Sequence, residues 1–132
     1  MRALDTNVLI RFLVRDDARQ ANIVYRLFKE AEENKDTLFV PLLVVLEVFW
    51  VLESVYEIQR TDILDAIHEL ILMPILDFEA QSTILHAISQ ARETRTDLPD
   101  LLTAHSARAS GSECVLTFDR QASNLEFFEI LK

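Results

Sequence analysis

Short apolar runs alternate with longer segments of helical hydrophobic spacing along the 132 residues of this chain. The first run, Ala3-Leu4, ends at Asp5, and apolar positions at helical spacing follow as far as Val14. We interpret this stretch as a strand, a tight turn and a helix that Thr6 or Asn7 can N-cap. Asp5 itself fits either a capping role or a functional role at the end of the strand.

The same alternation continues to the end of the chain. It predicts helices over 8–14, 21–34, 42–56, 63–72, 79–94 and 101–110, and strands over 3–4, 37–40, 74–77, 114–118 and 127–131. Asp17 and Thr61 are expected to be N-caps, and Gly111 a C-cap. Because helices separate successive strands, we expect one α/β domain over residues 1–132. Its mostly parallel sheet of four to five strands would have the order 3-2-1-4-5 and helices on both faces.

Composition narrows the range of functions. The start of the chain lacks the pattern of a secretory leader, and the longest apolar run, 38–52, is too short to cross a bilayer, so we expect no membrane segment. Cys114 is expected to be buried and inert, which fits a reducing compartment such as the cytoplasm. The net charge of −9 argues against nucleic-acid binding through a broad basic face, but leaves room for a local basic rim.

From Leu42 to Leu52 every residue except Glu47 is apolar. A helix that is apolar on all sides is buried on several sides, so we expect its outer face, around Phe49 and Trp50, to meet another chain. Glu47 would then be a carboxylate in apolar surroundings, which must become neutral, pair with a cation or bind a metal. A partner arginine and an outward-pointing side chain are the alternatives.

Four acids are predicted to converge: Asp5, Glu47, Asp100 and Asp119. Asp5 and Asp119 end strands that would be neighbours, about 5 Å apart. Four such carboxylates repel one another unless a cation lies between them, and oxygen ligands without cysteine or histidine select Mg²⁺ or Mn²⁺. Asp77 also ends a predicted strand, but that strand would lie at the edge of the sheet, about 10 Å from Asp5. We therefore do not count Asp77 among the converging acids.

Asp97 and Asp100 also fit a capping box, in which Asp97 caps the helix and Asp100 reaches back to it. We interpret Asp97 as the cap and Asp100 as the functional acid. If Leu101 and Leu102 pack inward, then Asp100 faces the groove.

Four stretches surround these acids: LDTNVLIRFL, VVLEVFWVL, DLPDLLTAHSA and VLTFDRQ. In their order and spacing they resemble the PIN-domain nucleases, and most closely the VapC-type toxins of bacterial toxin–antitoxin pairs, over the whole chain. The resemblance implies a three-layer α/β/α, Rossmann-like domain that hydrolyses RNA phosphodiesters with a divalent metal. It places the acidic quartet on the four residues above and supporting roles on Asn7 and Thr117. Leu98-Pro99 departs from the Ala or Phe-Ala that many relatives have before the third acid.

The resemblance also implies an antitoxin partner and a homodimer, with RNA as substrate. Four arginines lie near the acids in sequence and are candidates for phosphate contacts: Arg11, Arg15, Arg95 and Arg120. Two alternatives remain open. One is a catalytically idle PIN-like binding module. The other is a receiver-type or haloacid-dehalogenase-type phosphoryl-transfer domain, which this chain fits less well because Asn7 stands at the second position of its Asp-x-Asp motif and the only late lysine is Lys132.

Overall fold

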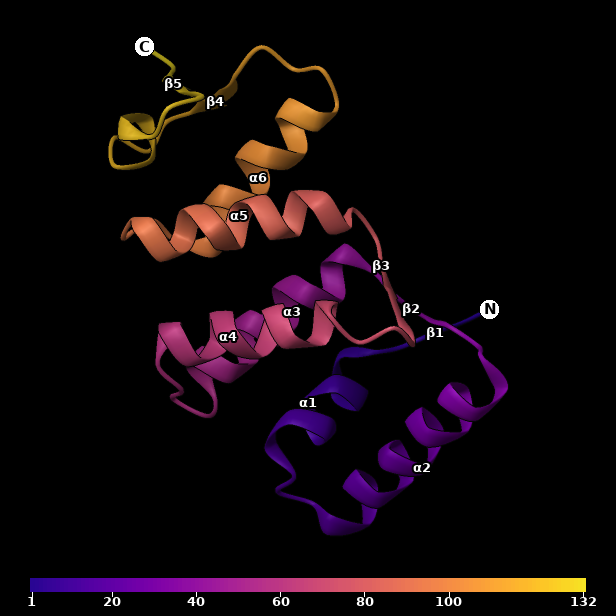
Figure 1. The fold of residues 1–132 in the computed structure, drawn as a ribbon. Coiled ribbons are helices and arrows are strands. Elements are labelled where there is room, and N and C mark those ends of the chain that lie inside the picture. Colours follow the sequence, from indigo (N-terminus) through magenta and orange to yellow (C-terminus); the bar gives the residue numbers. More distant parts are fainter. The chain divides into compact units, whose positions relative to one another are not determined.

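A computed structural model describes residues 1–132, and its alternating strands and helices confirm the α/β class (Figure 1). The strands are β1 (Arg2–Ala3), β2 (Leu38–Val40), β3 (Leu76–Phe78), β4 (Val115–Thr117) and β5 (Phe128–Ile130). The helices are α1 (Thr6–Val14), α2 (Ala18–Asn34), α3 (Leu42–Ser54), α4 (Arg60–Ile71), α5 (Gln81–Glu93) and α6 (Leu98–Ala109), with a 3₁₀ turn, η1 (Ala122–Asn124). No helix is both long and apolar enough to cross a membrane.

The chain divides into two compact units, which we call the N-terminal unit (residues 1–81) and the C-terminal unit (residues 82–132). In the N-terminal unit β1, β2 and β3 form a parallel sheet with β2 in the middle. In the C-terminal unit β4 and β5 form a second parallel pair. Both pairings agree with the predicted order 3-2-1-4-5. The remaining neighbour relation, β1 beside β4, would join the two units and stays a prediction, as does the single domain.

The apolar positions at helical spacing form the buried interior of the N-terminal unit. Helix α1 packs against α2 and α3, and α3 packs against α4. Phe12 of α1 and Phe28 of α2 meet with ring centroids 4.8 Å apart. The side chains with almost no exposed surface are Leu9, Leu38, Val40, Val48, Leu52, Ile63, Leu64 and Ile67.

Two contacts hold the elements of the C-terminal unit. His105 Nε2 of α6 lies 2.7 Å from Gln90 Oε1 of α5, where it donates in the tautomer that carries a proton on Nε2. The Arg108 guanidinium lies 4.7 Å from the ring centre of Phe127, just before β5. Together these contacts join α6 to α5 and to the residue that precedes β5.

Two of the predicted N-caps are corrected by the structure. Asp5, not Thr6 or Asn7, is the N-cap of α1, and Gln59, not Thr61, is the N-cap of α4. In both places the helix begins earlier than the apolar spacing indicates, because polar residues occupy the first turn. Asp17 is the N-cap of α2 as predicted.

The C-cap of α6 is Ser110, one residue before Gly111. Gly111 has a φ of 89°, a left-handed conformation that glycine adopts without a steric penalty. Glycine therefore ends this helix at the position after the cap, where left-handed glycines usually occur.

Candidate metal centre

Asp5 lies where β1 passes into α1. The Leu4 N–H donates to Phe39 O at 2.8 Å, which extends the parallel pairing to the residue before Asp5. Asp5 Oδ1 accepts the Thr6 N–H at 2.8 Å, and the side chain is exposed. The carboxylate thus caps a helix and also stands at the carboxyl end of a strand. A helix N-terminus attracts negative charge, so this position suits an acidic side chain.

Glu47 lies in the middle of α3, and its exposed side chain corrects the expectation of an apolar environment. Helix α3 buries Val45, Val48, Phe49 and Leu52, which share one face at helical spacing. The opposite stripe is formed by Leu43, Glu47 and Trp50, with 77% of Leu43 and 59% of Trp50 exposed. The outward-pointing alternative for Glu47 therefore holds.

The start of α3 depends on Glu79, which the sequence reasoning missed. Pro41 is the N-cap residue of α3 and makes no side-chain cap bond. Glu79 directly follows β3, and its Oε1 accepts the Leu42 N–H at 2.9 Å. The Glu79 N–H donates to Val40 O at 2.9 Å, so the ends of β2 and β3 meet here. Proline has no side-chain oxygen to accept a backbone N–H. A proline at an N-cap is therefore the signal that another residue, distant in sequence, supplies the acceptor.

Asp119 lies two residues after the end of β4 and is held in a tight turn. Its N–H donates to Thr117 Oγ1 at 3.0 Å, and its Oδ1 accepts the Gln121 N–H at 2.9 Å and the Ala122 N–H at 3.4 Å. The side chain is exposed. Thr117, expected to support the site, thus fixes the backbone at Asp119.

Asp100 lies in the first turn of α6 and is half-buried. Burial raises the pKa of this carboxyl, and the negative charges of Asp97 and Asp119 raise it further. The N-cap residue is Asp97, as predicted, but its side chain makes no cap bond, so the capping box does not form. Asp100 is therefore free of the capping role and lies within the electrostatic field of Asp119.

The four predicted ligands are divided between the two units. The N-terminal unit carries Asp5 and Glu47, and the C-terminal unit carries Asp100 and Asp119. Neither unit by itself gathers three or more histidine, cysteine, aspartate or glutamate side chains at metal-binding distances. The convergence of all four acids stays a prediction. Within the C-terminal unit, the mutual repulsion of Asp100 and Asp119 is the electrostatic situation that a bound cation relieves.

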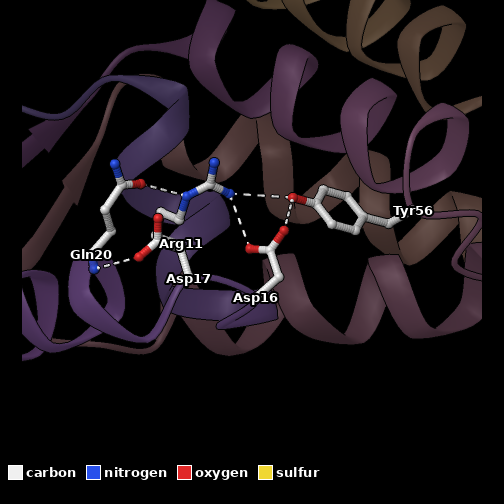
Figure 2. Close-up of polar contacts among 5 residues, drawn as sticks. All are labelled: Arg11, Asp16, Asp17, Gln20 and Tyr56. Atoms are coloured by element: carbon white, nitrogen blue, oxygen red, sulfur yellow. Dashed lines mark hydrogen bonds and ion pairs between the residues drawn. The ribbon is translucent and has the colours of Figure 1, made fainter.

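Arg11 takes part in a polar network that ties the end of α1 to the loop after α3 (Figure 2). Arg11 Nε donates to Gln20 Oε1 at 2.6 Å, and Nη1 donates to Asp16 Oδ1 at 3.1 Å and to the Tyr56 hydroxyl at 3.2 Å. The Tyr56 hydroxyl donates in turn to Asp16 Oδ2 at 2.8 Å. The hydrogen bond that Arg11 donates to the Tyr56 hydroxyl is the main reason that the pKa of Arg11 is raised. These bonds give Arg11 a structural role, and its contact with RNA stays a prediction.

The other three candidate arginines are exposed. Arg15 has its guanidinium 6.0 Å from the ring centre of Phe12, and its Nε donates to Phe12 O at 3.4 Å. Arg95 lies between α5 and α6, and Arg120 directly follows Asp119. Of these three, Arg120 is the cation placed beside a candidate metal ligand in the same unit.

Replacing Arg11 by methionine is expected to lower the melting temperature. The change keeps the length of the side chain but leaves Asp16, Gln20 and Tyr56 without their shared donor. The control is Arg95→Met, which removes an exposed arginine outside this network. Thermal denaturation measures both, and an unchanged melting temperature for Arg11→Met would show that the network contributes nothing to stability.

Cys114 is half-buried, which corrects the expectation that it is buried. Its Sγ lies 3.7 Å from Glu129 Oε2 on the neighbouring strand. Burial and the Glu129 carboxylate raise the pKa of the thiol, which keeps it in its unreactive protonated form at neutral pH.

Comparisons with known proteins match nearly the whole chain. The profile of the family described as PIN domain matches residues 2–127, which includes all four acids. A protein described as VapC ribonuclease, from Aquifex aeolicus (strain VF5), is 28% identical over 127 residues. The aligned region covers 96% of this chain and 93% of that protein. The match spans both units and confirms the PIN-like fold expected from the sequence.

Proposed function

Because this chain belongs to the PIN domain family, we propose that it is a metal-dependent endoribonuclease and the toxin of a toxin–antitoxin pair. The observation that supports this most is the family match over residues 2–127, a range that includes all four acids. Within the C-terminal unit, burial raises the pKa of the Asp100 carboxyl and the charges of Asp97 and Asp119 raise it further, so a cation bound there would favour its ionised form. The similarity to a VapC ribonuclease over nearly the whole chain favours RNA as the substrate.

Asp5, Asp100 and Asp119 would hold the metal, and Glu47 would bind it as well or orient the attacking water. These donors are all carboxylate oxygens, which suit Mg²⁺ or Mn²⁺. When bound, such an ion lowers the pKa of a water molecule and stabilises negative charge on the reacting phosphate. Thr117 positions Asp119 by accepting its backbone N–H, and Asn7, exposed in the first turn of α1, would support Asp5.

The RNA backbone would be bound by local cations, since the net charge of the chain is −9. Arg15, Arg95 and Arg120 are exposed, and arginine forms forked contacts with phosphate. Arg11 would contact RNA only through the part of its guanidinium group that is not bonded to Gln20, Asp16 or Tyr56. An RNA substrate would also place the protein in the cytoplasm.

Two protein partners are part of the proposal. The exposed apolar stripe of α3, Leu43 and Trp50 around Glu47, would form the centre of a homodimer, because side chains of this size gain most when they are covered. An antitoxin would inhibit by placing a basic side chain against the acids. The negative charge of this chain favours such an insert.

Mn²⁺ is expected to raise the melting temperature of the native chain, because a ligand that binds only the folded state stabilises it. The increase should be on the order of 5–10 °C when Mn²⁺ exceeds its Kd about 100-fold. Asp119→Asn should melt higher than the native chain without metal, since the change removes repulsion with Asp100, and should lose the response to Mn²⁺.

The control for this experiment is Asp77→Asn. Asp77 is an exposed acid within β3 and has no part in the proposed metal site. It should keep the full response to Mn²⁺. A native chain whose melting curve does not change in millimolar Mn²⁺ would count against a metal site.

A further inference from the structure

An open pocket of about 780 Å³ lies in the C-terminal unit beside Asp119. It is formed by the residues that follow β4 and by the end of β5. The lining side chains that matter here are Phe118, Arg120, Asn124, Leu131 and Lys132. One large aromatic ring, two cations and an amide therefore border the same hollow.

Phe118 is unusual because 79% of its surface is exposed, although the backbone around it is fixed. The Leu131 N–H donates to Thr117 O at 2.8 Å, which continues the β4–β5 pairing up to Phe118. On the other side of Phe118, the Asp119 turn is held by the Thr117 hydroxyl and the Gln121 N–H. The exposed ring thus lies on a segment whose backbone is hydrogen-bonded on both sides of Phe118, and packing within the unit does not explain its exposure.

We infer that Phe118 is a stacking platform for an unpaired base of single-stranded RNA, with Arg120 and Lys132 contacting the adjoining phosphates. The inference rests on the proposed function, because Asp119 would hold the metal beside the phosphate that is cut. A base next to that phosphate would then reach the side chain next to Asp119. Every base offers a flat face to an aromatic ring, and cations beside the ring track the backbone.

The charge distribution favours RNA over an apolar protein segment in this pocket. The chain is strongly acidic overall, yet both charged side chains that line the pocket are basic. A purely apolar occupant would leave these cations without a partner. Asn124 adds an amide that can donate to and accept from the edge of a base.

The test compares variants that separate aromatic character from apolar character. Phe118→Leu keeps an apolar side chain but removes the ring, and Phe118→Tyr keeps the ring. Leu116→Ala is the control, because Leu116 lies in β4 two residues before Phe118, is 57% exposed and does not line this pocket. Binding is measured in the Asp5→Asn background with Mg²⁺, by the fluorescence of a single-stranded RNA that carries 2-aminopurine.

Phe118→Leu is expected to weaken RNA binding roughly 10-fold and to abolish the quenching of 2-aminopurine. Phe118→Tyr and Leu116→Ala should bind as the unchanged background does. In chains that keep Asp5, Phe118→Leu should raise KM for RNA cleavage more than it lowers kcat.

The outcomes separate this inference from the proposed function. If the native chain cuts RNA but Phe118→Leu keeps its affinity and its quenching, the platform is wrong and the nuclease stands. If quenching depends on the ring but the native chain does not cut RNA, the nuclease is wrong and the platform stands. Absence of RNA binding by the native chain and by the Asp5→Asn background would overturn both.

Discussion

Replacing Asp5 by asparagine is expected to lower the rate of RNA cleavage at least roughly 100-fold, with little change in the melting temperature. Loss of a residue that only supports a metal ligand already costs about 10- to 100-fold, so loss of a ligand should cost at least as much. Asparagine keeps an oxygen that can accept the Thr6 N–H and is as good an N-cap as aspartate. The change therefore removes the charge and leaves the start of α1 intact.

The matched control is Asp77→Asn, which removes an exposed carboxylate from β3 in the same unit. It should cleave RNA at the native rate. Initial rates on a single-stranded RNA at saturating Mg²⁺ measure both variants. Native activity in Asp5→Asn would remove Asp5 from the catalytic site.

Trp50→Glu is expected to weaken the proposed homodimer at least about 30-fold, because tryptophans at the centre of an interface carry a large share of its binding energy. Since 59% of Trp50 is exposed, the substitution should leave the fold of the subunit intact. Sedimentation velocity at micromolar concentration measures the change. Leu72→Glu is the control, because Leu72 is also exposed but follows α4.

Phe49 cannot serve for this test, although it was predicted to share the outer face with Trp50. Its side chain is 4% exposed, so Phe49→Ala would cost about 3–5 kcal/mol of folding stability. A native chain that sediments as a monomer at high concentration would contradict the dimer, and the exposed stripe of α3 would need another explanation.

Phe49 is buried and Trp50 is exposed, a difference that the hydrophobic pattern of α3 does not predict. Periodic spacing identifies the buried face of a helix only when polar residues occupy the other face. In α3 nearly every residue is apolar, so the pattern predicts the helix but not its orientation. In α2, by contrast, charged residues alternate with apolar ones at helical spacing, and the apolar residues Val24, Phe28 and Ala31 are the buried ones.

The parts of the site that could be predicted are those that depend on residues close together in the sequence. Asp5 and Asp119 were placed at strand ends because each directly follows a short apolar run, and the structure places them there. The bond from Arg11 to Tyr56 joins residues 45 positions apart, and the cap that Glu79 supplies to α3 joins residues 37 apart. Sequence spacing does not predict contacts between residues so far apart, because these contacts depend on how α1, α3 and β3 pack together.

If this chain cuts RNA with a divalent metal held by its acids, then cleavage depends on that metal. The most direct test is to incubate the purified chain with single-stranded RNA in Mg²⁺, in EDTA, and in EDTA followed by excess Mg²⁺, beside Asp5→Asn purified in the same way. We predict cleavage by the native chain in Mg²⁺, no cleavage in EDTA, recovery when Mg²⁺ is restored, and no cleavage by Asp5→Asn. Equal cleavage in EDTA and Mg²⁺, or no cleavage by the native chain in Mg²⁺ or Mn²⁺, would contradict the proposed function.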